Sequence, residues 1–258
     1  MAKRNQNILE LQAALKTLKL STVSQCYQDC IDLAVREELS YEQFLLELFR
    51  RECEVRDIRR IERLLHNSKL PLEKSLALFN QKLLAARLRQ QVKILLGGEF
   101  VLGHENVLAF GNPGSGKTHL ICAIGQELVR QGYRVYFRQC TLMVEDLMRA
   151  KRDLELDKLL KKLSRFDVLI LDEIGYVQNK QRQEMEVLFT LLAQRYERGS
   201  VMITSNLPFS KWNEVFQDPM ITAAAIDRLV HHSIILEMNL PSYRAKQAKA
   251  SKRGQSKM

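Results

Sequence analysis

Eight consecutive residues combine glycines with a lysine and a hydroxyl side chain in a spacing that suits phosphate chemistry. They follow the apolar run 107–110 and precede a helical pattern, and they are Gly111, Asn112, Pro113, Gly114, Ser115, Gly116, Lys117 and Thr118. The glycines let backbone N–H groups turn inward around a polyphosphate at a helix N-terminus. Lys117 would reach the β- and γ-phosphates, and the Thr118 hydroxyl would ligate Mg²⁺. The segment therefore predicts a site for a nucleoside triphosphate.

Two neighbouring carboxylates close a second apolar run. Asp172 and Glu173 directly follow residues 168–171, which are Val, Leu, Ile and Leu. Such a run suits a strand buried on both faces of a parallel sheet, and ligand sites lie beyond the carboxyl ends of such strands. Asp172 would hold Mg²⁺ through its water shell, and Glu173 would polarise a water for attack on the γ-phosphate. Together with the phosphate loop, this pair favours hydrolysis over binding alone.

Three further polar residues follow later elements of the pattern. Asn206 closes the strand-like run 201–205 and could hydrogen-bond the attacking water or the γ-phosphate. Arg228 and Arg244 are candidate cations for the transition-state charge, a role worth about 10³–10⁵ in turnover. A surface salt bridge is the ordinary alternative for each arginine.

Length and composition exclude several classes of protein. The chain has 258 residues, of which 46% are hydrophobic, enough for an α/β core and a smaller module. No apolar run is long enough to span a bilayer and the N-terminus lacks a signal-peptide pattern, so we expect a cytoplasmic protein with no membrane partner. The five cysteines include Cys26 and Cys30 one helical turn apart, but no nearby residues complete a zinc set. Reduced, mostly buried thiols are expected.

The positive charge is concentrated at the C-terminus. The formal net charge is +10, and residues 241–258 contain six Lys or Arg and no acid. A basic segment of this composition predicts a disordered tail, over 246–258, that is drawn to phosphate backbones. A tail that only improves solubility is the alternative, and charge alone does not separate DNA from RNA or a membrane surface.

The first part of the chain has helical periodicity. The longest helical segment starts after Ser40, a candidate N-cap. It is expected to end before Pro71, because proline disfavours the helical conformation of the residue that precedes it. Its arginines between residues 50 and 63 are interleaved with acids, which predicts surface pairs along the helix or a ridge that contacts phosphates. Residues 1–80 are therefore expected to form a helical N-terminal domain.

From about residue 81 helices alternate with strands. The expected helices are 82–96, 117–131, 141–163 and 180–198, and the expected strands are 106–110, 134–138, 168–171, 200–204 and 233–236. This alternation predicts an α/β domain over residues 81–245, with a parallel sheet covered by helices on both faces.

Several segments match one family in sequence and spacing. They are Gly-Lys-Thr-His-Leu at 116–120, Leu-Asp-Glu-Ile-Gly-Tyr at 171–176, Ile-Thr-Ser-Asn-Leu-Pro-Phe-Ser-Lys-Trp at 203–212, Asp-Arg-Leu at 227–229 and Ser-Tyr-Arg at 242–244. Over roughly residues 8–245 the chain resembles AAA+ P-loop ATPases, among them the IstB-like transposition helpers and the related DnaC-like helicase loaders. Ser-Tyr-Glu-Gln-Phe-Leu at 40–45 resembles the IstB group.

The resemblance implies a role for each candidate residue. Residues 111–118 would form the nucleotide loop for ATP, with Asp172 and Glu173 as the Mg²⁺ and water-activating acids. Asn206 would be the polar sensor on the fourth strand of the sheet. Arg228 would act as a finger in a neighbouring subunit's site, and Arg244 would sense the γ-phosphate in its own site.

The resemblance also implies partners. An arginine acting in trans implies a homo-oligomer, as a ring or a spiral filament, and the family implies binding to double-stranded DNA and to the cognate transposase. A DnaC-like replicative helicase loader is the alternative within the fold. A nucleotide kinase, or an architectural protein that uses ATP only as an assembly ligand, is the alternative from another class.

Overall fold

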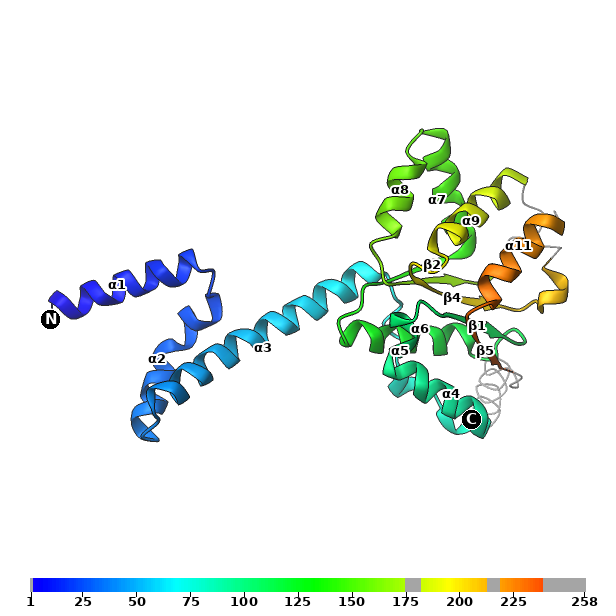
Figure 1. The fold of residues 1–258 in the computed structure, drawn as a ribbon. Helices are drawn as coiled ribbons and strands as arrows, with labels where there is room; N and C mark the ends of the chain where they lie inside the picture. Colours follow the sequence, from blue (N-terminus) through cyan, green and yellow to red (C-terminus); the bar gives the residue numbers. More distant parts are fainter. Residues whose placement is uncertain (1, 175–181, 213–218, 239–258) are drawn as a thin grey trace, which may run out of the picture. The chain divides into compact units, whose positions relative to one another are not determined.

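The computed structural model describes residues 2–174, 182–212 and 219–238 (Figure 1). The chain divides into two compact units, residues 1–63 and 64–258, and helix α3 (Tyr41–Ser68) belongs to both. The domain boundary expected from the sequence lies after residue 80, whereas residues 64–80 pack with the larger unit. Leu70 explains the difference, because its side chain is 5% exposed within a core of the larger unit.

The N-terminal unit consists of α1 (Ala2–Thr17), α2 (Ser21–Arg36) and the first part of α3. Its small core contains Leu15, Val23, Cys30 and Leu48. Ser40 and Gln43 form a reciprocal cap at the start of α3, in which Gln43 N donates to Ser40 Oγ and Ser40 N donates to Gln43 Oε1. The prediction that Ser40 caps this helix is therefore confirmed.

Glu52 is a buried carboxylate on α3 that holds the start of α2. Its Oε2 accepts the backbone N–H groups of Thr22 at 2.8 Å and Val23 at 3.0 Å, and its Oε1 accepts Arg56 Nε at 2.7 Å. N–H groups in the first turn of a helix have no partner within the helix, so a carboxylate placed there stabilises it. Burial raises the pKa of Glu52, but these hydrogen bonds outweigh burial and hold the pKa below its ordinary value.

We expect Glu52→Gln to lower the unfolding free energy of the helical unit by about 1–3 kcal/mol at neutral pH. The amide keeps the shape of the side chain but loses the charge that these donors contact. Because the folded-state pKa is depressed, the stabilisation is full above pH 4.5 and is lost as the pH falls through the folded pKa. Urea unfolding followed by circular dichroism should therefore show a difference from wild type that shrinks in acid.

Glu54→Gln is the matched control, because Glu54 is exposed on the same helix. Its unfolding free energy should stay within about 0.5 kcal/mol of the wild-type value. A Glu52→Gln deficit that is the same at neutral and acidic pH would contradict the capping role of the carboxylate.

The larger unit is built on a five-stranded parallel sheet in the order β2-β3-β4-β1-β5. The strands are β1 (Asn106–Phe110), β2 (Val135–Gln139), β3 (Val168–Asp172), β4 (Ser200–Ser205) and β5 (Ser233–Glu237). All five lie where the sequence predicts strands, to within one residue at each end. The predicted α/β class with a parallel sheet is confirmed.

Helices cover both faces of the sheet (Figure 1). One face carries α4 (Ala86–Gly97), α5 (Glu99–Leu102) and α6 (Lys117–Arg130), and the other carries α7 (Cys140–Arg152), α8 (Leu156–Leu163), α9 (Arg182–Arg195) and α11 (Pro219–Val230). Short 3-10 turns lie at Leu76–Leu78, Gln81–Leu83 and Phe209–Lys211. None of the described helices combines the length and apolar character that a bilayer span requires.

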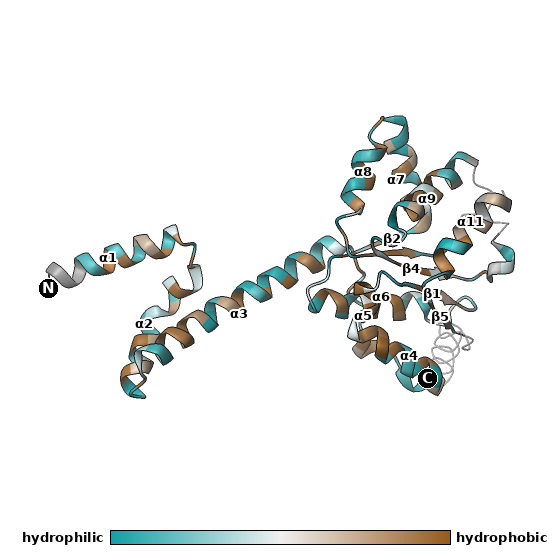
Figure 2. Ribbon diagram, viewed as in Figure 1, coloured by the Kyte–Doolittle hydropathy of each residue, from teal (hydrophilic) through white to brown (hydrophobic). Residues whose placement is uncertain are grey.

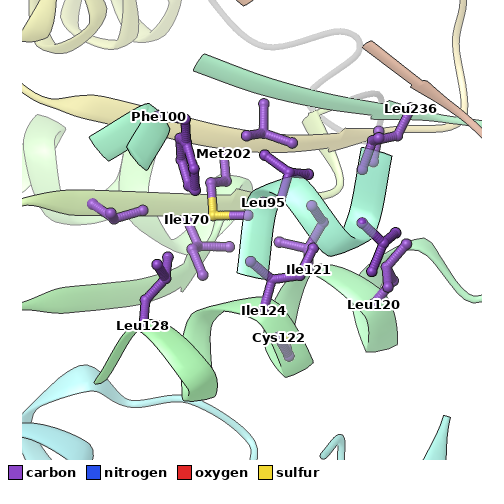
Figure 3. Close-up of a cluster of buried hydrophobic side chains, with 14 of the residues drawn as sticks. Leu95, Phe100, Leu120, Ile121, Cys122, Ile124, Leu128, Ile170, Met202 and Leu236 are labelled. Carbon is purple, nitrogen blue, oxygen red and sulfur yellow. The ribbon is translucent and has the colours of Figure 1, made fainter. Parts of the chain in front are cut away.

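The two faces bury separate hydrophobic cores, because alternate residues of each strand point to opposite faces. Leu169 and Leu171 lie in the core under α7, α8 and α9, whereas Val168 and Ile170 lie in the core against α4 and α6. Figure 2 shows the central strands as hydrophobic, and Figure 3 shows Ile170 and Met202 of the sheet facing side chains of α6. This packing fixes the sheet and α6 relative to each other.

The segment that follows α3 packs along α6. Gln126 Nε2 donates to the carbonyl of Pro71 at 2.9 Å, and His119 Nε2 lies 2.9 Å from the carbonyl of Ser75. The Phe79 ring packs edge-on against His119, with ring centroids 5.3 Å apart. The contacts of His119 hold the first turn of α6, which begins at the phosphate loop, and the bond from Gln126 holds the helix further along.

Candidate active site

The phosphate loop occupies the connection between β1 and α6. At Gly111 φ is +152°, and a Cβ there would lie 2.3 Å from the carbonyl oxygen of Met238. Met238 N in turn donates to Phe110 O at 2.7 Å, so the chain after β5 closes on the end of β1. Gly116 has φ +93° and is the N-cap of α6. Both positions need glycine, because other residues rarely adopt these angles and Gly111 has no room for a side chain.

The side chains of the loop gather polar groups at the start of α6. Lys117 is only 8% exposed, and its Nζ donates to the carbonyls of Gly111 at 2.7 Å and Asn112 at 3.0 Å. Ser115 is 4% exposed, and its Oγ has no hydrogen-bond partner within the described ranges. A buried ammonium, an unsatisfied hydroxyl and a helix N-terminus together form an environment suited to a polyphosphate anion.

A chain of hydrogen bonds links the loop to the acid pair. Thr118 Oγ1 donates to Asp172 Oδ1 at 2.8 Å, and Thr204 Oγ1 donates to the same oxygen at 2.6 Å. The backbone N–H of Glu173 then donates to Thr204 Oγ1 at 2.8 Å. The structure therefore brings together Thr118, Asp172 and Glu173, which the sequence placed at one site. It adds Thr204, to which the sequence assigned no role.

Glu173 has an unusual backbone conformation. Its φ is +63°, in the left-handed region, and its side chain is half-buried. The other described non-glycine residues with positive φ lie just after helices, where such angles are common, whereas Glu173 directly follows β3. A non-glycine residue held in a sparsely populated conformation costs about 1–3 kcal/mol and persists when its surroundings enforce it. Here the hydrogen bond to Thr204 is such a constraint.

The remaining candidates differ in their surroundings. Asn206 lies just beyond β4 at the same end of the sheet as Asp172, and its Oδ1 is buried without a partner in the described structure. The Arg228 guanidinium lies over the ring of Phe189 on α9, 4.8 Å from the ring centroid. Its Nη1 is likewise buried with no acceptor among the described residues. Arg244 falls outside the described residues.

The two cysteines next to the site have unreactive thiols. Cys122 on α6 and Cys140 on α7 are buried, and burial, with a smaller effect of the Asp172 charge, raises the pKa of each thiol to about 12. Both thiols therefore stay protonated at neutral pH and are poor nucleophiles. All five cysteines are free, and the described residues contain no cluster of three or more His, Cys, Asp or Glu that could hold a metal ion.

The arginines of α3 divide into two groups within the N-terminal unit. Arg51 pairs with Glu47 at 2.9 Å, Arg56 pairs with Glu52, and Arg59 donates to Ser21 Oγ at 3.2 Å. These three take part in the fold, as the prediction of surface pairs requires. The second group is exposed and has no ion pair to another described residue, and it consists of Arg50, Arg60 and Arg63.

Comparison with known proteins identifies the family. The sequence model of the family described as IstB-like ATP binding protein matches residues 13–251. The chain belongs to this family. It is 43% identical over 240 residues to an insertion sequence ATP-binding protein of Sinorhizobium fredii, covering 93% of this chain and 80% of that one. It is 39% identical over 238 residues to the IS21 ATP-binding protein of Pseudomonas aeruginosa, covering 92% and 89%.

Solved structures show the same fold at lower sequence identity. The DnaC helicase loader is 16% identical with a TM-score of 0.56, covering 65% of this chain and 98% of that one. DnaA from Aquifex aeolicus bound to AMPPCP is 21% identical with a TM-score of 0.55, covering 72% and 56%. These likenesses establish the AAA+ fold of this IstB-like family member and confirm the resemblance drawn from its motifs.

Proposed function

We propose that this IstB-like protein is an ATP-dependent DNA-binding helper of insertion-sequence transposition. It assembles as an oligomer on double-stranded DNA, hydrolyses ATP, and regulates or recruits its transposase. Family membership supports ATP binding in the context of an insertion sequence. The single observation that supports hydrolysis is the hydrogen-bonded series from Thr118 through Asp172 and Thr204 to Glu173.

The residues present fit a magnesium–ATP substrate. Thr118 Oγ1 and Asp172 Oδ1 lie 2.8 Å apart, and a hydroxyl with a carboxylate is the hard oxygen donor set that Mg²⁺ prefers. Thr118 and Asp172 would hold the ion, directly or through water, and the bound ion would neutralise charge on the β- and γ-phosphate oxygens. The backbone N–H groups of residues 114–118 and the Lys117 ammonium bind the phosphates themselves.

Asp172 and Glu173 have different roles in hydrolysis. Asp172 stays a hydrogen-bonded carboxylate beside Thr118, while Glu173 accepts a proton from the attacking water. Asn206 orients that water or the γ-phosphate through its side-chain amide, whose Oδ1 has no partner among the described residues. Arg228 supplies positive charge to the site of a neighbouring subunit, and the absence of an acceptor for its Nη1 among the described residues supports this role. Arg244, outside the described residues, serves the site of its own subunit.

The helical and basic segments supply the DNA contacts. We assign the helical unit, residues 1–63, to DNA and partner binding, the larger unit up to residue 245 to the ATPase, and residues 246–258 to a basic tail attracted to phosphates. The exposed arginines of α3 support this assignment, because charges without ion-pair partners among the described residues can pair with phosphates. Since the proposed function is carried out on DNA beside a transposase, we assign the protein to the cytoplasm.

Replacing Arg50, Arg60 and Arg63 together with Ala should weaken DNA binding and reduce its salt dependence. Each phosphate that the variant no longer neutralises lowers the slope of log affinity against log salt by about 0.9. Fluorescence anisotropy with a labelled duplex over a salt series measures both quantities. Arg89→Ala, on an exposed position of α4 in the other unit, is the control and should keep the wild-type slope. An unchanged slope in the triple variant would show that these arginines do not contact phosphates.

Sedimentation velocity tests the assembly. With ATP, Mg²⁺ and a duplex, the full chain should form a large oligomer that disappears when ATP is omitted. A species that remains monomeric under all conditions would contradict the proposed assembly on DNA.

A further inference from the structure

The register of the sheet places Thr204 beside the acid pair. Thr204 lies on β4 and aligns with Ala109 on β1, and its neighbour Ile203 aligns with Leu171 on β3. Since β4 lies between β3 and β1, a side chain near its carboxyl end meets both the end of β3 and the connection that follows β1. Thr204 is fully buried there.

The Thr204 hydroxyl makes two hydrogen bonds of opposite direction. A carboxylate oxygen only accepts and a backbone N–H only donates, so the hydroxyl donates to Asp172 Oδ1 at 2.6 Å and accepts from Glu173 N at 2.8 Å. One hydroxyl therefore connects the side chain of the first acid to the backbone of the second. Serine could replace threonine in both bonds, whereas valine, of nearly the same shape, could make neither.

Both bonds constrain groups that hydrolysis uses. Asp172 Oδ1 receives hydroxyls from Thr118 and Thr204, which together fix the rotation of its carboxylate. The bond to Glu173 N holds the residue at φ +63°, an angle that sets the direction in which its side chain leaves the backbone. Without this bond Glu173 would relax toward commoner angles, and its carboxylate would move away from the water it activates.

We infer that Thr204 is a positioning residue for ATP hydrolysis, which orients Asp172 and locks Glu173 in its strained conformation. The inference rests on the proposed hydrolysis and adds to it a residue that touches neither the phosphates nor the water. Its action is on the geometry of the base, so replacing it affects turnover and leaves the phosphate loop intact.

The test compares Thr204→Val, Thr204→Ser and wild type in the full chain. Steady-state ATP hydrolysis gives kcat and KM, and titration with a fluorescent ATP analogue gives affinity. Thr204→Val should lower kcat on the order of 10²-fold, the scale of a small misplacement of a catalytic group, with affinity changed less than about threefold. Thr204→Ser should retain most of the wild-type kcat. In a Glu173→Gln background, Thr204→Val should decrease kcat much less than it does in wild type, because the part of its effect that acts through Glu173 is already lost.

Thr190→Val controls for the chemical change itself. Thr190 on α9 donates only to the carbonyl of Glu186, at 2.8 Å, and its replacement should leave hydrolysis unchanged. A Thr204→Val protein with wild-type kcat, or with kcat and affinity falling in parallel, would overturn the inference and leave the proposed function standing. Wild-type protein without Mg²⁺-dependent hydrolysis would contradict the proposed function itself.

Discussion

Glu173→Gln is expected to reduce ATP turnover by about 10²–10⁴-fold while ATP binding is retained. Glutamine has the size of glutamate and keeps the backbone N–H that donates to Thr204, so the local conformation persists. Its amide cannot accept a proton from water, so the attack of water on the γ-phosphate loses its general base. On DNA the variant should therefore accumulate as an ATP-bound oligomer, which filter binding and sedimentation would detect together.

The control for this substitution is Glu99→Gln, an exposed glutamate on α5 away from the sheet edge. Its turnover should equal that of wild type. If Glu173→Gln hydrolyses ATP at the wild-type rate, another group is the base. If the variant leaves DNA rapidly in the presence of ATP, hydrolysis does not control release.

Lys117→Ala should abolish measurable nucleotide binding and, with it, assembly. The Lys117 ammonium is buried at the N-terminus of α6, and it is the cation of the loop that a polyphosphate would meet. Removing one partner of a buried, hydrogen-bonded charge pair costs about 2–5 kcal/mol, which is roughly 30-fold to several thousand-fold in affinity. Isothermal titration calorimetry with ATP and Mg²⁺ should therefore detect no binding at concentrations that saturate the wild-type protein.

Lys93→Ala, an exposed lysine on α4, should bind ATP as wild type does and controls for the general removal of a charge. Since Lys117 also donates to the carbonyls of Gly111 and Asn112, a thermal melt must accompany the titration. A folded Lys117→Ala protein with wild-type affinity would show that the phosphates bind elsewhere.

The phosphate loop can be predicted from the sequence because its chemistry depends on residue types in a fixed local order. Gly111 and Gly116 stand where the backbone needs angles that other residues avoid, and Lys117 and Thr118 follow at the helix start. The whole arrangement lies within one strand–loop–helix connection. No knowledge of distant contacts is needed to recognise it.

Thr204 gives no comparable signal. A threonine near the end of an apolar strand is an ordinary strand former. Its role depends on β4 lying between β3 and β1, an order that the alternation of helices and strands does not specify. The matched segment 203–212 contains Thr204, but only the hydrogen bonds to Asp172 and Glu173 distinguish its hydroxyl from that of any other buried threonine.

In the N-terminal unit, too, a role that depends on contacts between distant residues is not evident from the sequence. In the sequence, Glu52 is a charged residue at a position where the helical periodicity of residues 41–65 calls for an apolar side chain. In the structure its carboxylate caps α2, which is distant in sequence and adjacent in space. The residues after α3 similarly follow a helix that begins in the N-terminal unit, but they pack along α6, because Leu70 and Pro71 have contacts there.

The most direct test of the account is steady-state ATP hydrolysis by the full chain with Mg²⁺, with and without double-stranded DNA. We predict Mg²⁺-dependent turnover that rises when DNA is added and is abolished in Glu173→Gln. Turnover that is absent in wild type under both conditions, or that persists unchanged in Glu173→Gln, would contradict the assignment of this site as a DNA-coupled ATPase centre.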